Sequence, residues 1–165
     1  MHTPTTDSLF LFEALELAQA AGQRGEVPVG AVLVHEGRVI GKGSNRREEL
    51  GRATAHAEIL ALEDYSRQTG QWRLPPGTSL YVTVEPCMMC TGALLWSRLA
   101  EVFYGCADPK QAGLRTLLPL IQGGAMDHRF DKIAGGIEEE RCAELMREFF
   151  RGRREQKRAL STINA

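Results

Sequence analysis

The chain contains 165 residues with a formal net charge of −1, and 43% of its residues are hydrophobic and 25% charged. This composition excludes a polycationic chain and supplies enough apolar side chains for a core without disulfide bonds. No run of about 18 apolar residues occurs, and the N-terminus lacks a basic segment followed by an apolar one, so we expect neither a membrane span nor a secretory signal. We therefore expect one domain over residues 1–165, a cytoplasmic location and no membrane partner.

The predicted elements of the N-terminal half are two helices and a hairpin. Residues 8–21 are predicted to form the first helix. The apolar segments 29–35 and 39–43, separated by the turn Glu-Gly-Arg, predict a β-hairpin. A polar loop follows, and then a helix over about residues 54–68.

Strands and helices also alternate in the C-terminal half. Residues 78–84 are rich in β-branched side chains and predict a buried strand. Pro86 is expected to open the next helix as its first residue, and this helix would run to about Arg98. The remaining expected elements are strands at 101–106 and within 130–136, an apolar segment at 113–122 that fits either a helix or irregular packing, and a long helix from about residue 137. This order favours an α/β sheet of about five strands covered by helices on both faces.

The last helix, expected at about 137–158, ends in a basic segment. Residues 151–158 carry five positive side chains and one negative side chain. Cations stabilise the C-terminal end of a helix through the helix dipole, so a solvated helix end is one interpretation. The other interpretation is contact with nucleic-acid phosphates, for which Arg151, Arg153 and Arg154 are the candidates.

The cysteines provide the strongest chemical signal. Because a disulfide framework is not expected in a reducing cytoplasm, the close pair Cys87 and Cys90 indicates metal or redox chemistry. The Cys-x-x-Cys spacing alone is compatible with a redox pair, half of a structural zinc site or half of a catalytic one. Cys106 and Cys142 are isolated, and we expect them to be small buried hydrophobic residues.

A catalytic zinc site would need a third ligand, and His56 fits because it too opens a predicted helix. His56, Cys87 and Cys90 would leave a fourth coordination position open, which distinguishes catalytic zinc from structural zinc. Such a site needs a residue that moves protons, and Glu58 is the first candidate and Glu85 a weaker one. On a regular helix the side chains of His56 and Glu58 would point to nearly opposite sides, so we do not expect both to bind the metal.

The segments His-Ala-Glu (56–58) and Pro-Cys-Met-Met-Cys (86–90) together resemble the signature of the zinc-dependent nucleobase deaminases. Within that superfamily the chain is most similar to the bacterial tRNA-specific adenosine deaminases. The similarity covers nearly the whole chain. The stretches that carry it are residues 26–34, 45–46, 54–62, 80–90, 92–98, 108–110, 127–129 and 141–150.

The resemblance implies a three-layer α/β/α fold with a mixed five-stranded sheet, one Zn²⁺ per subunit, no organic cofactor and a homodimer. By position, His56, Cys87 and Cys90 would bind zinc and Glu58 would transfer protons. The implied reaction is the hydrolytic conversion of adenosine to inosine in tRNA, at the wobble position of the anticodon.

The resemblance also implies a set of substrate contacts. Asn45 would lie against the flipped nucleoside, although an Asn at this position is also compatible with a simple turn. Val29 and Ala57 would line the base pocket, and Asp108 would lie beside the substrate backbone.

Three positions in the expected pocket loops depart from the family pattern. Arg52 replaces an acidic residue, residues 111–116 replace a Thr-Gly loop of small residues, and Asp127 replaces an asparagine. These departures keep other hypotheses open. One is a paralogous deaminase of another RNA, of single-stranded DNA or of a free base such as guanine or cytosine. Another is a non-catalytic, zinc-stabilised RNA-binding module. A thioredoxin-like redox role is weaker because it leaves His56 and Glu58 unexplained.

Overall fold

The structure is a computed structural model that describes residues 5–108, 110 and 113–163. Helices and strands alternate along the chain, as the sequence pattern predicts. In chain order they are α1 (Thr6–Gln23), β1 (Gly30–His35), β2 (Arg38–Ser44), α2 (Arg47–Leu50), α3 (Ala57–Thr69), β3 (Ser79–Val84), α4 (Met88–Trp96), β4 (Glu101–Cys106), α5 (Gly113–Gln122), β5 (Lys132–Ala134) and α6 (Glu139–Ile163). Within these described ranges, no helix is long and apolar enough to cross a membrane.

The described strands form one mixed sheet of five strands in the order β2-β1-β3-β4-β5. Strand β1 pairs antiparallel with β2 and with β3, whereas β3, β4 and β5 pair in parallel. The predicted hairpin is confirmed, because Glu36 and Gly37 form the two-residue turn between β1 and β2. Their φ angles of 48° and 72° are both positive, as a type I′ turn requires.

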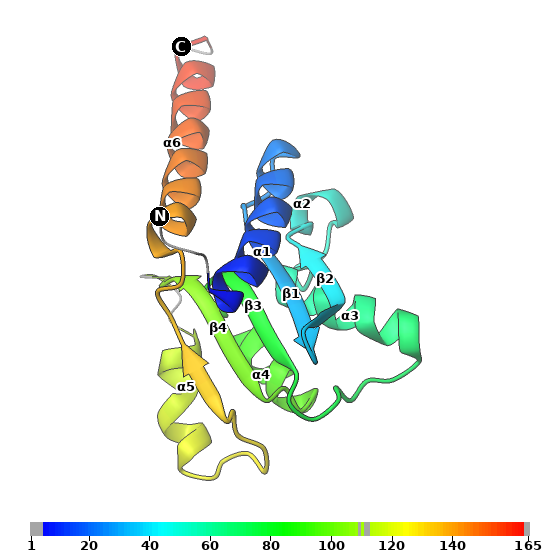
Figure 1. Cartoon of the computed structure of the whole chain (residues 1–165). Helices are drawn as coiled ribbons and strands as arrows, with labels where there is room; N and C mark the ends of the chain where they lie inside the picture. The colour runs from blue at the N-terminus through cyan, green and yellow to red at the C-terminus, as the bar shows by residue number, and fades with distance from the viewer. Residues whose placement is uncertain (1–4, 109, 111–112, 164–165) are drawn as a thin grey trace.

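Helices cover both faces of this sheet and give the three-layer arrangement that was expected (Figure 1). The side chains of β1 alternate between the two faces, as the pleat of a strand dictates. Ala31 and Leu33 pack with residues of α3, α4 and α5. Val32 and Val34 pack with residues of α1 and α6 on the opposite face.

The α1 and α6 face buries the two isolated cysteines. Cys106 at the end of β4 and Cys142 in α6 belong to the same buried cluster, so the prediction that they are buried hydrophobic residues is confirmed. The first turns of α6 pack near β4, and the helix then extends past the sheet toward the C-terminus (Figure 1). The second half of α6 therefore stands clear of the core.

Helix α3 begins later than predicted. It starts at Ala57, and His56 is its N-cap residue in an extended conformation, with φ −79° and ψ 155°. The backbone before His56 bonds to another segment. The Ala55 carbonyl accepts a hydrogen bond from the Arg46 N–H and therefore does not take part in the helix. His56 is thus outside the regular helix.

Helix α4 is also shorter than predicted, and Pro86 is not its first residue. The helix starts at Met88 with Cys87 as N-cap. The Pro86 carbonyl accepts a hydrogen bond from the Leu114 N–H at 3.1 Å, which fixes Pro86 in the connection rather than in the helix. The helix ends at Trp96, because Arg98 has a φ of 66° and leaves the helical conformation.

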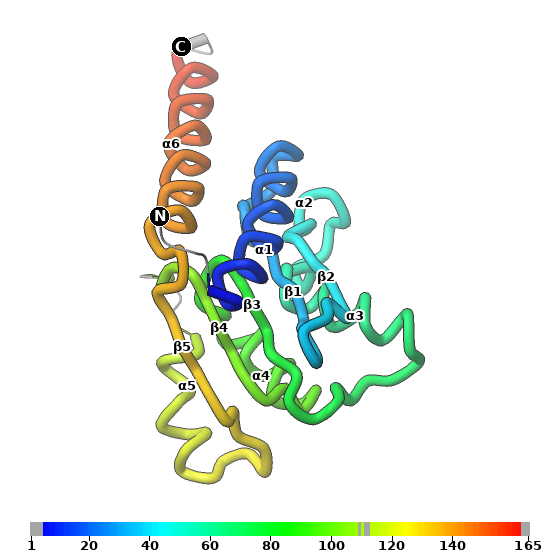
Figure 2. Tube along the Cα trace, in the orientation of Figure 1, coloured from blue at the N-terminus to red at the C-terminus, as the bar shows by residue number. Residues whose placement is uncertain are grey.

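The structure shows the conformation of residues 113–122 and the extent of the fifth strand. The apolar segment 113–122 is helix α5, which contains Pro119 in its interior. Strand β5 comprises Lys132–Ala134, shorter than the predicted segment 130–136, and it lies beside β4 at the edge of the sheet (Figure 2).

Candidate active site

Strand direction brings distant segments to one edge of the sheet. Because β1 runs antiparallel to β2 and β3, the strands β2, β3, β4 and β5 all run in the same direction. Their carboxyl ends therefore lie at one edge, where α/β sheets commonly bind ligands. The segments that follow these strands, and the residues that precede β1, meet at this edge.

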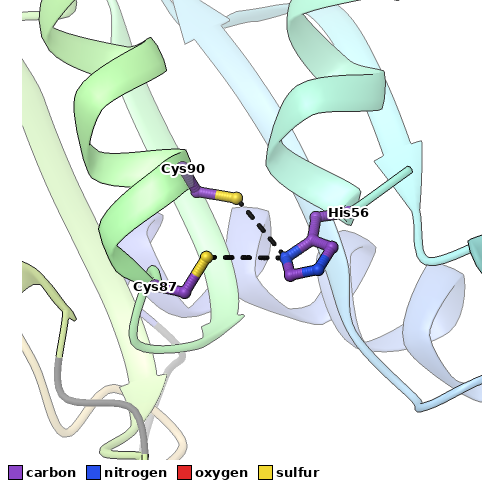
Figure 3. Close-up of side chains that lie close together, drawn as sticks. All are labelled: His56, Cys87 and Cys90. Carbon is purple, nitrogen blue, oxygen red and sulfur yellow. Dashed lines mark hydrogen bonds between the residues drawn. The ribbon is translucent and has the colours of Figure 1, made fainter. Parts of the chain in front are cut away.

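Three potential metal ligands meet there, and they come from the starts of two helices (Figure 3). His56 is the N-cap of α3, Cys87 is the N-cap of α4, and Cys90 lies in the first turn of α4. The His56 Nδ1 atom is 3.6 Å from the Sγ atom of Cys87 and 3.6 Å from that of Cys90. The three ligand atoms lie within 4.8 Å of one another.

The chemistry of these donors fits zinc. One imidazole nitrogen and two sulfurs form a ligand set that binds zinc in preference to hard cations, which favour oxygen ligands. Three protein ligands also leave one position of a tetrahedral ion open. The predicted cluster of His56, Cys87 and Cys90 is therefore assembled by the fold, although these residues are up to 34 positions apart in sequence.

The two thiols shift each other's pKa in opposite directions. A hydrogen bond from the Cys90 thiol lowers the pKa of Cys87 to about 4. The same hydrogen bond, together with burial, raises the pKa of Cys90. The hydrogen bond between His56 and the Cys87 sulfur raises the pKa of His56. A metal ion that binds both sulfurs has to displace the proton that Cys90 retains.

Glu58 lies in the first turn of α3 beside this cluster. It is only 3% exposed, and burial raises its pKa to about 7. Glu58 is not part of the group of potential ligands, in agreement with the prediction that His56 and Glu58 do not both bind the metal, although both residues line the same cleft. The regular-helix argument does not apply because His56 precedes the first helical residue.

The cleft at this edge has a volume of about 940 Å³. The four predicted substrate contacts all line it, and they are Val29, Asn45, Ala57 and Asp108. It also contains residues that were not predicted as site residues, among them Val27, Arg47, Lys110, Ala143, Met146 and Phe150. Met146 and Phe150 are four positions apart, which is the spacing of one helix face, and this pattern is the same for a core and for the wall of a cleft.

Asn45 is held in place by a buried carboxylate and is not a free turn residue. Its Nδ2 atom donates to Glu26 Oε2 at 3.5 Å, and its backbone N–H donates to the Val29 carbonyl at 3.0 Å. Glu26 is 1% exposed and also accepts the backbone N–H groups of Glu48 and Glu49. Glu26 was missed in the sequence because nothing in its local pattern indicates burial.

The three basic candidates of α6 separate into two groups. Arg151 and Arg154 line the cleft. The Arg153 guanidinium instead lies over the ring of Phe149, with 5.9 Å between the guanidinium carbon and the ring centroid. Residues 151 and 154 share one face of a helix, whereas residue 153 is rotated away from it.

Each described departure from the family pattern has a partner inside the chain. Arg52 forms an ion pair with Glu63 at 2.8 Å and is not among the cleft residues. Asp127 accepts two hydrogen bonds from Arg98, at 2.8 and 3.0 Å. The third departure is the segment 111–116. Within it Arg115 pairs with Glu85, and residues 111 and 112 lie outside the described part of the chain.

The weaker proton-transfer candidate, Glu85, is thus engaged in an ion pair. Its side chain is fully buried, and the Arg115 Nε atom lies 3.0 Å from its carboxylate. Glu85 also lines the cleft. Glu58 is the better candidate for proton transfer because burial has already moved its pKa toward neutrality.

A mixed sheet between helices, with a His-Cys-Cys cluster and a buried glutamate at one edge, is the arrangement of the zinc-dependent nucleobase deaminases. Comparison with known proteins agrees with this class. Residues 4–106 match the family described as the cytidine and deoxycytidylate deaminase zinc-binding region. The chain belongs to this family and, within it, to the tRNA-specific adenosine deaminases.

The relatives match over almost their whole length. The tRNA-specific adenosine deaminase of Bacillus subtilis (strain 168) is 43% identical over 155 residues, covering 94% of this chain and 95% of the relative. The tRNA-specific adenosine deaminase of Agrobacterium fabrum (strain C58) is 43% identical over 145 residues, covering 88% and 94%. A solved structure from a study of A-to-I editing by tRNA:A34 deaminases at the wobble position superposes with a TM-score of 0.77, with 42% identity and coverage of 83% and 98%.

Zinc binding should weaken as the pH falls. Cys90 and His56 both have raised pKa values, so protons compete with the metal for these ligands over the neutral range. We expect the apparent zinc affinity to fall about tenfold per pH unit while one proton is displaced, and more steeply once His56 is also protonated. Competition with a chelator at pH 8, 7 and 6 measures this slope, and an affinity that does not change with pH would contradict the predicted ligand set.

Proposed function

We propose that this chain is a hydrolytic deaminase that converts adenosine to inosine in tRNA, at the wobble position of the anticodon. The observation that carries the proposal is the His-Cys-Cys cluster beside buried Glu58 in a cleft that α6 extends with arginine side chains. The tRNA-specific adenosine deaminases that share 43% of its residues support the same substrate. The single-domain organisation over residues 1–165 and the cytoplasmic location remain predictions.

In the proposed mechanism His56, Cys87 and Cys90 hold one zinc ion. When bound, the zinc lowers the pKa of a water molecule to about 7 and so supplies a nucleophile at neutral pH. The positions of His56 and Cys87 as N-caps direct the partial positive charge of two helix starts toward the cluster, which helps to keep the sulfurs deprotonated.

Glu58 transfers the protons of the reaction. It takes up a proton from the attacking water and delivers a proton to the amino group on C6 of adenine. The C6–N bond then breaks, ammonia leaves and inosine remains, so that adenosine and one water yield inosine and one ammonia. The burial that raises the pKa of Glu58 to about 7 suits a group that both accepts and donates a proton at neutral pH.

The base is bound between the segments that flank β1 and β2. Val29 and Ala57 supply backbone and apolar contacts, and the Asn45 amide hydrogen-bonds the flipped nucleoside. Because Glu26 accepts one N–H of this amide, the orientation of Asn45 is set before the substrate binds. Asp108 accepts a hydrogen bond from the Lys110 N–H at 2.8 Å, and we assign it a position beside the substrate backbone.

The chain also has a surface suited to the proposed homodimer. Among the described residues, Met88, Met89 and Trp96 on α4 and Leu120 on α5 are exposed large hydrophobic side chains. Helices α4 and α5 pack together, so these side chains lie on one helical layer. Exposed large apolar side chains on two neighbouring helices support the assignment of this layer as the dimer interface.

Loss of Glu58 should stop the chemistry without loss of the metal. We expect Glu58→Ala to lower the single-turnover rate of deamination by about 10²–10⁴-fold, because the proton carrier is removed. The zinc content and the affinity for RNA should stay at their wild-type values. Glu63→Gln on the same helix is the matched control, since Glu63 is exposed and pairs with Arg52. An active Glu58→Ala enzyme would assign proton transfer to another group.

The basic residues of α6 should differ in their effect on RNA binding. We expect Arg151→Gln and Arg154→Gln each to weaken binding of an anticodon stem-loop and to reduce the salt slope by about 0.7–0.9 per lost phosphate contact. Arg153→Gln is the control, because it removes the same single positive charge. It should change neither the RNA affinity nor the salt slope, because Arg153 stacks on Phe149. Equal effects of all three variants would show that net charge alone, and not the cleft, attracts the RNA.

The substrate class is tested by a panel of substrates. We expect mass spectrometry after incubation with the zinc-loaded protein to detect inosine in an anticodon stem-loop that contains a wobble adenosine. Single-stranded DNA, free guanine and free cytosine should be turned over far more slowly. Turnover of a free base without dependence on Arg151 and Arg154 would favour the paralogous deaminase, and no turnover of any substrate would favour the non-catalytic RNA-binding module.

The dimer proposal is tested by placing a charge on the exposed apolar surface. We expect the wild-type protein to sediment as a dimer and Trp96→Glu to sediment as a monomer at the same concentration, because an unpaired carboxylate is unfavourable in an apolar contact. Trp72→Glu is the control, since Trp72 is equally exposed but lies outside α4 and α5. A wild-type monomer would remove the dimer from the proposal.

A further inference from the structure

An ion pair joins the start of α5 to the segment that precedes Cys87. Arg115 donates its backbone N–H to Glu85 Oε1 at 3.1 Å. Its side-chain Nε atom lies 3.1 and 3.0 Å from the two carboxylate oxygens of Glu85. The Glu85 side chain is fully buried, whereas that of Arg115 is 54% exposed. A buried carboxylate is therefore stabilised by a cation that reaches it from the surface.

The neighbours of Arg115 in α5 hold the same segment. The Leu114 N–H donates to the Pro86 carbonyl at 3.1 Å. At Gly113, an added Cβ atom would lie 2.1 to 2.7 Å from backbone atoms of Cys87 and Met88, so the two backbones are in direct contact. The first three residues of α5, Gly113, Leu114 and Arg115, thus touch Cys87, Pro86 and Glu85 respectively.

This contact lies directly beside a proposed zinc ligand. Cys87 is an N-cap residue, and no side-chain hydrogen bond of its own caps the helix. On its N-terminal side, the Glu85 N–H bonds to the Cys106 carbonyl at 2.9 Å, so β4 supports the backbone of this segment. Arg115 adds a support at the buried carboxylate, on the side of α5.

We propose that Arg115 is a positioning residue for zinc binding. Through Glu85 it holds the segment Pro86–Cys87 so that the Cys87 sulfur stays opposite His56. The inference rests on the proposed role of Cys87 as a zinc ligand. Arg115 belongs to the segment in which the sequence departs from the family pattern, so the proposal gives a function to one residue of that departure. Residues that support metal ligands from outside commonly change metal affinity by about 10–100-fold when they are replaced.

The test is the rate of zinc release from the full-length, zinc-loaded protein into an excess of a colorimetric chelator. We expect Arg115→Met to release zinc about 10–100-fold faster than the wild type. Arg115→Lys, which keeps the charge but loses the planar donor geometry, should fall between the two. Arg52→Met is the matched control, because it removes an arginine from an exposed ion pair away from the cleft and should release zinc at the wild-type rate.

A second comparison separates positioning from general stability. If Arg115 only stabilised the fold, Arg115→Met would lower the Tm of the zinc-free protein and leave zinc release at the rate of the Arg52→Met control. That result would overturn the proposal. We expect Arg115→Met to release zinc faster than the Arg52→Met control. We also expect it to lower the Tm of the zinc-loaded protein more than the Tm of the zinc-free protein.

The ion-pair mechanism has its own test. The double variant Glu85→Gln with Arg115→Met removes the unpaired buried charge, so its zinc release should be slower than that of Arg115→Met alone. Equal or faster release would overturn the mechanism. If Arg115→Met does not fold, Arg115→Lys provides the same comparison with a smaller expected change. A wild-type protein that binds no zinc would refute the proposed zinc site itself, independently of Arg115.

Discussion

The direction of the strands is the constraint on which the site depends. A single antiparallel strand, β1, lies between β2 and β3, so the other four strands end at the same edge of the sheet. Three of these ends each deliver a different part of the site. Asn45 follows β2, Glu85 and Cys87 follow β3, and Asp108 follows β4. A reversal of β3 relative to β2 would place the ligands at opposite edges, where no common ion could reach them.

Two buried carboxylates, Glu58 and Glu85, line the cleft and a third, Glu26, lies behind Asn45, and their surroundings differ. Glu26 accepts backbone N–H groups and fixes Asn45. Glu85 pairs with Arg115 and lies against the turn before Cys87. Glu58 lies beside the His-Cys-Cys cluster, and burial raises its pKa to about 7. The partners of a buried carboxylate therefore decide whether it supports the backbone or is suited to carry a proton.

Helix α6 contributes to the core with its first turns and to the cleft with later residues. Near its start Cys142 belongs to the core, and further along Met146, Phe150 and three arginines line the cleft. A helix that leaves the core as it extends past the sheet changes from a packing element to a wall of the site. This geometry gives the cleft both apolar and cationic surface, a combination that suits bases and phosphates.

Local patterns in the sequence determined the alternation of elements, the Glu36–Gly37 hairpin turn and the Cys-x-x-Cys pair, because these depend on residues close together in the chain. Family resemblance added the joint role of His56 and Glu58. The starts of α3 and α4 were misplaced, because Ala55 and Pro86 bond to Arg46 and Leu114 in other segments. The partners of Arg52, Asp127 and Glu85 could not be predicted either. Glu85 and Arg115 are 30 positions apart, and only the packing of α5 on the end of β3 brings them together.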